Sequence, residues 1–219
     1  MIDEFLESDL NEKNCADLFS KVYDNFKFNE DTQTWFIFEG TSWKELKDDR
    51  RLRSKWNVIA EWALLQAKIN YERLCYIQSS PTFLKKKAKF VVNTINPMLN
   101  CRKKKYIVDS VSELDECYIN DSTFNSKSLF NTKNATINTA SGVPTLGHNK
   151  EDYLTMTANV EFDETFSKKC QEWKDFIEEA IPDEETRRYV QKYMGYCLTG
   201  ENTEDVFFFL YGRGSTGKT

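Results

Sequence analysis

The chain has 219 residues, which is enough for one or two domains; 40% of the residues are hydrophobic and 30% are charged. This balance supplies a core and excludes a wholly disordered protein, and the low usage of Gly (8) and Pro (4) excludes collagen-like or low-complexity material. The longest apolar run, residues 206–211, is too short to span a membrane, and the first residues are acidic where a signal peptide is basic. We therefore expect a soluble protein without a membrane partner.

The net charge of −5 conceals one strongly basic segment. Residues 73–108 carry 9 basic and no acidic side chains, whereas the residues before and after them are net acidic. Eight of these cations form two clusters: Lys85, Lys86, Lys87, Lys89, Arg102, Lys103, Lys104 and Lys105. So dense a group of cations favours binding to phosphates, while charge alone supports a solvated helix face equally well.

The 6 cysteines and the single histidine, His148, are too widely spaced for a zinc site. No two cysteines are separated by only two residues, as zinc knuckles and redox motifs require. The sequence therefore predicts reduced, mostly buried thiols and no metal site built from cysteine.

The chain opens with a helical pattern followed by a hairpin. Apolar residues recur at helical spacing over residues 15–26, which predicts an amphipathic helix. Residues 35–43 then predict a β-hairpin that turns at Gly40 and carries Trp35 and Trp43. We expect both tryptophans in the core, with base stacking as the alternative.

Two further helices are expected before the middle of the chain. Residues 51–69 place Trp and Ala residues on one helical face. Residues 82–95 follow Pro81, present apolar side chains on one face and lysines on the other, and end before Pro97. The basic segment is therefore expected to be partly helical.

The second half of the chain has two parts that differ in composition and in predicted secondary structure. Residues 120–165 are rich in Asn, Ser and Thr, contain short apolar runs at strand spacing, and include turn chemistry at 138–144, so they predict a β-rich module. Residues 170–181 and 182–198 then form two helical stripes, the second opened by Pro182 and closed by Gly200. A break this short predicts an antiparallel helical hairpin, which we expect to dock on a neighbouring element or subunit through Trp173 and Tyr193.

The expected fold class is α+β: a mainly helical region with a β-hairpin and a β-rich insert, leading into the first strand and phosphate-binding loop of an α/β NTPase. The expected divisions are a helical N-terminal region, a β-rich module, a helical hairpin and a truncated ATPase domain, at residues 1–110, 111–165, 166–200 and 201–219.

The last eight residues match the phosphate-binding P-loop G-x-x-x-x-G-K-[ST]. They are Gly212, Arg213, Gly214, Ser215, Thr216, Gly217, Lys218 and Thr219. Glycines let consecutive backbone N–H groups converge on phosphate oxygens, the ammonium of Lys218 reaches the β- and γ-phosphates, and the Thr219 hydroxyl binds Mg²⁺. The apolar run 206–211 directly before the loop is typical of a buried parallel strand. ATP and Mg²⁺ are therefore the expected ligands, with Lys218 as the catalytic cation and Thr219 as the metal ligand.

The residues upstream of this loop indicate which NTPase it is. They read Trp173-x-x-Phe176, then Gln191-x-x-x-Gly195-Tyr196-x-Leu198-Thr199-Gly200, then the apolar run and the loop. This order resembles the primase–helicase family of phages, plasmids and large DNA viruses, which belongs to the superfamily 3 helicases of the AAA+ type. The resemblance covers about residues 28–219 and is most specific over 170–219. Thr216 and Thr219 stand where Asn and Ser are common, and no primase signature is present.

The resemblance implies an ATP-dependent replicative DNA helicase that forms a hexamer and moves on single-stranded DNA. The region before the loop would load DNA and support assembly, and the protein would work in the cytoplasm, that of the host if the source is a phage or virus. Because the loop's later partners are missing, we expect the 219 residues to be an inactive fragment. The alternatives are a non-catalytic DNA-binding or assembly module and another P-loop NTPase, such as a kinase or GTPase.

Overall fold

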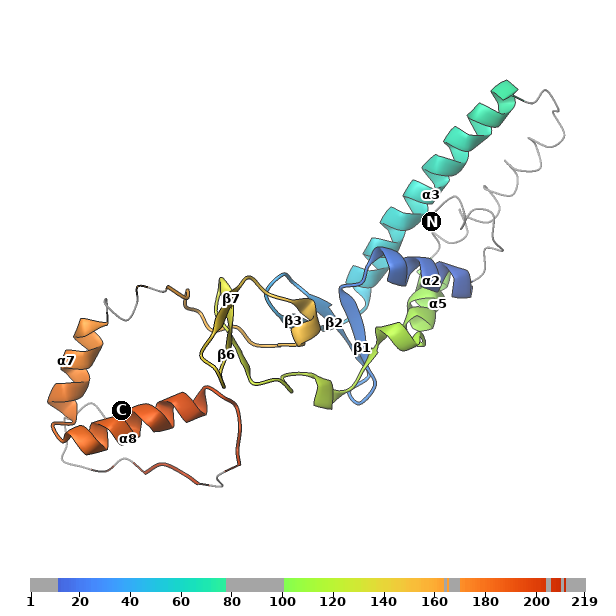
Figure 1. Ribbon diagram of the computed structural model, residues 1–219. Coiled ribbons are helices and arrows are strands. Elements are labelled where there is room, and N and C mark those ends of the chain that lie inside the picture. Colours follow the sequence, from blue (N-terminus) through green and yellow to red (C-terminus); the bar gives the residue numbers. More distant parts are fainter. Residues whose placement is uncertain are drawn as a thin grey trace. The chain divides into compact units, whose positions relative to one another are not determined.

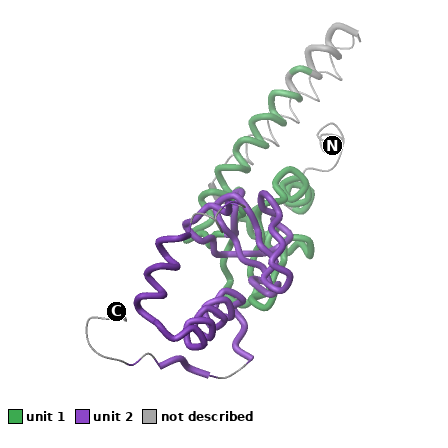
Figure 2. Tube along the Cα trace, turned by 60° about the vertical axis from the view of Figure 1, so that its left-hand side comes forward, with its two compact units in different colours: residues 1–39, 44–123 green, residues 40–43, 124–219 purple. Residues whose placement is uncertain are grey.

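The structure is a computed structural model that describes residues 12–77, 101–163, 165, 170–203, 206–209 and 211 (Figure 1). Figure 2 shows its two compact units in different colours. The first unit comprises Met1–Glu39 and Lys44–Thr123, and the second comprises Gly40–Trp43 and Phe124–Thr219. No helix among the described residues is long and apolar enough to cross a membrane.

The first unit combines helices with a four-stranded sheet. Its helices are α2 (Glu12–Val22), α3 (Arg50–Ile77) and α5 (Cys101–Ser112), and its strands are β1 (Phe26–Asn29), β2 (Thr34–Phe38), β3 (Trp43–Leu46) and β4 (Tyr118–Ile119). The first residue of β3, Trp43, is assigned to the second unit. The strands lie in the order β3-β2-β1-β4, with β1 antiparallel to β2 and parallel to β4. Short 3₁₀ turns at Asp115–Cys117 and Asp121–Thr123 flank β4.

The core of this unit is assembled from all three helices and the sheet. Phe19 from α2, Phe26 from β1, Trp56 from α3 and Val111 from α5 are all buried. Phe19 and Phe26 lie with ring centroids 5.9 Å apart, within the range of favourable aromatic contacts. Burial of these rings holds the short strands against the helices, which strands of this length need for stability.

The structure confirms most expectations for this unit and corrects one. The hairpin with Gly40 in its turn is present, Gly40 has a φ of 87°, and the helix expected over 51–69 extends to Arg50–Ile77. The first helix, by contrast, ends at Val22 instead of continuing to Phe26. Asp24 and Asn25 form a turn, because Phe26 must enter β1 to pair with β2. The helix expected over 82–95 lies outside the described residues.

The second unit contains the expected β-rich module, a three-stranded antiparallel sheet. Its strands are β5 (Leu129–Asn131), β6 (Ala135–Asn138) and β7 (Pro144–Leu146), in that order. The turn between β6 and β7 closes with a hydrogen bond from the Gly142 N–H to the Asn138 oxygen, 2.8 Å, where Gly142 has a φ of 72°. A 3₁₀ turn at Lys150–Asp152 follows.

Both expected C-terminal helices exist, as α7 (Gln171–Ala180) and α8 (Glu184–Cys197). The start of α8 differs from the expectation, because Asp183 is the N-cap and Pro182 precedes it. The Thr186 N–H donates to Asp183 Oδ2 at 2.7 Å, which satisfies one of the free donors of the first turn. Figure 1 shows α7 and α8 meeting at a corner, so the antiparallel side-by-side packing expected from the short break is wrong.

A pair of tryptophans on α3 tests which face of this helix supports the fold. Trp56 is 1% exposed and Trp62, six residues later, is 49% exposed. Trp56→Ala should lower the free energy of unfolding by about 3–5 kcal/mol, because it leaves a large cavity. Trp62→Ala should change the unfolding free energy of the single, undimerised chain by no more than about 1 kcal/mol. Urea unfolding followed by circular dichroism measures both, and equal losses would contradict the assigned core.

Candidate functional site

The P-loop, residues 212–219, lies outside the described residues, so the structure does not test its geometry. The chain leading to it is described at residues 206–209 and 211, which contain no strand. The parallel strand expected there is therefore not formed in this structure. A parallel strand needs neighbouring strands for its N–H and C=O groups, and no described strand pairs with these residues.

One aromatic of this segment nevertheless has a defined position. The ring of Phe208 stacks on Tyr193 of α8, with ring centroids 4.3 Å apart and planes 18° from parallel, and it also contacts Tyr189 at 5.8 Å. Phe207 and Phe209, on either side, are 88% and 74% exposed. The tyrosine stripe of α8 thus binds the segment that precedes the P-loop, which is one of the two docking partners expected for it.

The other face of α8 forms an apolar groove with α7. The groove has a volume of about 390 Å³. Trp173 and Ile177 contribute from α7, and Val190 and Met194 contribute from α8. Trp173 is half exposed. The groove is an open surface of this unit.

Arg187 fixes the corner between these two helices. Its guanidinium donates to the Ile181 oxygen at 2.9 Å and to the Pro182 oxygen at 3.3 Å, and it lies 3.5 Å from Glu178 Oε1. These carbonyls follow the end of α7, where a cation is also favoured by the helix dipole. The corner is therefore held by hydrogen bonds as well as by the cap at Asp183.

The predicted nucleic-acid contacts are only partly within the described residues. Four of them lie outside the described residues: Lys85, Lys86, Lys87 and Lys89. The backbone of Arg102 is part of α5. Lys103 and Lys105 on α5 are exposed and Lys104 is half-buried, and no described residue forms an ion pair with any of the three.

The cations of α5 are held in place by the opposite face of the same helix. Ile107, Val108 and Val111 are buried in the core of the first unit, next to α2. This packing fixes the orientation of α5 and leaves two of its three described lysines exposed. The helix can therefore present positive charge to a ligand at little cost in reorganisation.

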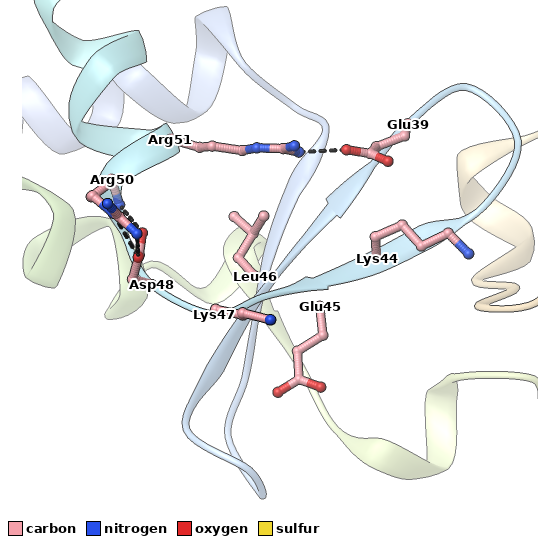
Figure 3. A pocket seen from close by; sticks show the side chains of 8 residues that line it. All are labelled: Glu39, Lys44, Glu45, Leu46, Lys47, Asp48, Arg50 and Arg51. Atoms are coloured by element: carbon pink, nitrogen blue, oxygen red, sulfur yellow. Dashed lines mark hydrogen bonds and ion pairs between the residues drawn. The ribbon is translucent and has the colours of Figure 1, made fainter.

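A second charged site, which the sequence did not single out, lies between β3 and the first turn of α3 (Figure 3). This pocket has a volume of about 430 Å³ and is lined by Glu39, Lys44, Glu45, Leu46, Lys47, Asp48, Arg50 and Arg51. The charge-rich run of residues 44–53 is the sequence signal that could have indicated it.

Ion pairs neutralise much of the charge in this pocket. Arg50 Nε donates to Asp48 Oδ2 at 2.7 Å, and this arginine lowers the pKa of the Asp48 carboxyl. Figure 3 shows Arg51 reaching across to Glu39, with which it forms an ion pair. With four basic and three acidic side chains, the pocket has only a small positive excess, and the Arg51–Glu39 pair links the end of β2 to the start of α3.

Trp43 belongs to an aromatic cluster in the second unit. It stacks on Tyr153 with centroids 5.8 Å apart, and Phe124 meets it edge-on at 6.5 Å. Its indole Nε1–H donates to the Lys150 oxygen at 2.8 Å. Trp43 is 1% exposed and Trp35, in the first unit, is also buried, so both tryptophans are core residues and neither presents a face to a nucleobase.

The described cysteines agree with the expectation of reduced thiols. None of the four cysteines whose side chains are described, Cys15, Cys117, Cys170 and Cys197, forms a disulfide; Cys15 and Cys117 are buried, whereas Cys170 is partly exposed and Cys197 is exposed. Burial raises the pKa of the Cys117 thiol to about 11, so this group stays protonated and unreactive near neutral pH. Among the described residues no cluster of His, Cys, Asp and Glu side chains has the form of a metal site.

Comparison with known proteins identifies the family. The family described as "D5 N terminal like" matches residues 16–182, most of the chain. The chain therefore belongs to the D5 N-terminal-like family, the N-terminal region of primase–helicase proteins.

One curated relative is similar over most of the chain. It is a protein of Acanthamoeba polyphaga mimivirus named "Putative helicase", 24% identical over 199 residues, which cover 84% of this chain and 20% of the relative. The chain thus spans about a fifth of the length of this relative.

The cap of α8 gives the C-terminal corner a defined pH dependence. Hydrogen bonds from Thr186 hold the pKa of the Asp183 carboxyl below its ordinary value of 3.8. A lowered pKa means that the ionised cap stabilises the helix above that value and that this contribution is lost as the pH falls below 3.8, through the folded-state pKa. Protection of the α8 amides against hydrogen exchange should therefore weaken over that range.

Asp183→Asn keeps a capping oxygen but removes the titrating group, so its α8 amides should lack this acid-dependent loss. Glu179→Gln, which removes an exposed carboxyl of α7 that caps nothing in the described structure, should behave as the unmodified chain does. The cap would not be responsible if all three proteins lost protection of α8 in parallel.

Proposed function

We propose that this chain is the DNA-loading and assembly region of an ATP-dependent DNA helicase, joined to the phosphate-binding loop of its motor. The observation that carries this proposal is the P-loop sequence at residues 212–219, in a chain whose preceding residues belong to a primase–helicase family. The name of the mimivirus relative supports the same function. We further propose that the motor is of the superfamily 3, AAA+ type and acts as a hexamer on single-stranded DNA.

The loop supplies the groups that a nucleoside triphosphate with Mg²⁺ requires. Backbone N–H groups between Gly212 and Lys218 bind phosphate oxygens, the Lys218 ammonium neutralises charge on the β- and γ-phosphates, and the Thr219 hydroxyl ligates the metal. When bound, ATP supplies the phosphoryl group whose hydrolysis drives movement. The stacking of Phe208 on Tyr193 places the segment before the loop beside α8. The corner formed by α7 and α8 would then support the motor.

Hydrolysis tests the proposal directly. The 219-residue chain should hydrolyse no ATP, because groups outside the P-loop must neutralise the charge of the transition state. A longer protein that includes the motor should hydrolyse ATP with stimulation by single-stranded DNA, and Lys218→Ala in it should lower kcat by about 10²–10³-fold. Lys192→Ala, which removes an exposed lysine of α8, is the matched control and should retain full activity. Full DNA-stimulated activity in Lys218→Ala would refute the proposal.

The basic segment supports binding of single-stranded DNA through phosphates. Residues 73–108 carry nine cations and no carboxylate, and the packing of α5 leaves Lys103 and Lys105 exposed. Such binding releases counterions, so affinity falls with salt and depends little on base sequence. The non-catalytic DNA-binding module stays as the second candidate, since these lysines would serve it equally well.

Paired charge reversals test this contact. Lys103→Glu with Lys105→Glu should weaken binding to all sequences and lower the slope of log K against log salt by roughly 1.4, about 0.7 for each lost phosphate contact. Lys13→Glu with Lys21→Glu makes the same change in net charge on exposed positions of α2 and should have a smaller effect. Fluorescence anisotropy with labelled oligonucleotides at several salt concentrations measures both. Equal effects of the two pairs would assign the binding to net charge alone.

A further inference from the structure

Helix α3 has two apolar faces, of which the structure buries one. Leu52, Trp56 and Ile59 face the core of the first unit. A second set of apolar side chains on the same helix is exposed: Val58 at 55%, Trp62 at 49%, Leu65 at 53% and Ile69 at 37%. Figure 1 shows α3 extending well beyond α2 and α5. The exposed set, which we call the outer stripe, therefore has no cover among the described elements of its own unit.

The spacing of the residues in the outer stripe indicates that its partner is a helix. Its residues follow one another at intervals of four, three and four, which is the a/d repeat of a coiled coil over two heptads. Isolated exposed apolar residues are common and need no explanation, but a continuous stripe of four on one helix indicates an interface. A seam of this kind packs against another helix.

The residues that continue the heptads identify the partner helix. The preceding a position is residue 55, a lysine, and the following d position is residue 72, a glutamate. Antiparallel pairing places each a residue in a layer with a d residue of the other helix. If the second helix is another α3, Trp62 of each copy packs against Leu65 of the other in the central layers. Val58 of each copy packs against Ile69 of the other in the next layers outward. In the outermost layers Lys55 meets Glu72, a pair of opposite charges.

We propose that α3 pairs with α3 of a second copy of this chain, antiparallel and through the outer stripe. The sequence complements itself only in this orientation, because a parallel pair would place Lys55 against Lys55 and Glu72 against Glu72. Lys55 is exposed, and its ammonium lies 5.2 Å from the centre of the Tyr23 ring, a contact that an exposed lysine gives up easily.

This contact differs in symmetry from the one that closes a ring. The same surface is used on both copies, so each chain engages one partner and the contact yields pairs. A ring of identical subunits needs two different surfaces that meet head to tail. The pairing therefore does not depend on the proposed helicase function, and it would join two chains whether or not they belong to rings.

Sedimentation equilibrium of the 219-residue chain tests the pairing. The chain should form a species of twice its 25.7 kDa at micromolar concentrations. Trp62→Glu should raise the dimer dissociation constant by at least about 100-fold, because it places two charges in the centre of an apolar seam. Tyr106→Glu is the control, since Tyr106 on α5 is also more than half exposed. Circular dichroism establishes that each variant is folded. A chain that remains monomeric to about 1 mM would overturn the proposal, as would a dimer that Trp62→Glu leaves intact.

A charge exchange tests the orientation and the identity of the partner together. Lys55→Glu and Glu72→Lys should each weaken the dimer by roughly tenfold, because each places like charges in both outer layers. The double variant exchanges the charges and should restore the original dissociation constant. An unrestored double variant would overturn the antiparallel pairing and would assign the stripe to another occupant, such as residues 82–95 of the same chain or a different protein. Measurement in the absence of ATP and DNA keeps this result separate from any failure of the helicase assignment.

Discussion

Burial of the Trp43 indole, together with an acceptor for its N–H group, is the constraint on which the packing around it in the second unit depends. Its large ring needs burial, and its single N–H needs an acceptor once it is buried. The Lys150 oxygen, 2.8 Å from Nε1, supplies the acceptor, and the backbone N–H of Trp43 donates to the Leu154 oxygen at the same distance. The 3₁₀ turn between these two carbonyls ends at Tyr153 in a left-handed conformation with a φ of 50°, which is costly for an aromatic residue. The stacking of Tyr153 on Trp43 helps to offset that cost.

The parts of the fold that could be predicted are those set by residues close together in the sequence. The helices of residues 12–22 and 50–77 and the hairpin at Gly40 follow from apolar spacing and one glycine, which are properties of short stretches. The end of the first helix could not be found in this way, because Tyr23 and Phe26 also fit its helical stripe. Phe26 leaves the helix because pairing with Ile37 in the sheet competes with the helical continuation, and that partner lies eleven residues away. The corner between α7 and α8 likewise depends on Arg187 reaching two carbonyls, which no periodicity reports.

The same distinction between local patterns and distant contacts applies to the candidate site. The P-loop could be recognised from the sequence because its chemistry needs fixed residue types at fixed spacing, whatever surrounds it. The strand before it could not be predicted in the same way, since a strand forms only with neighbouring strands, and no described strand pairs with residues 206–209 and 211. Spacing alone predicted the same docking role for Trp173 and Tyr193, yet Trp173 is half exposed while Tyr193 stacks on Phe208. The charged pocket beside α3 takes seven of its eight lining residues from the charge-rich run at 44–53, but the eighth, Glu39, follows β2, and its ion pair with Arg51 could not be read from that run.

The two faces of α3 show how one helix can serve folding and assembly without conflict. The core face is concentrated in the first half of the helix, where Leu52 and Trp56 belong to the same buried cluster as residues of α5 and the sheet. The outer stripe begins at Val58 and continues to Ile69, past the last residue of α3 in the core cluster, Ala60. A helix of 28 residues is about 42 Å long, more than twice the length of α5, so it supplies surface that its own unit cannot use. Because an isologous contact ends at a pair, this surplus adds one partner per chain and leaves the head-to-tail surfaces of a ring free. A hexameric motor built on this region would therefore have its subunits joined round the ring by other surfaces, with α3 available to join one ring to a second.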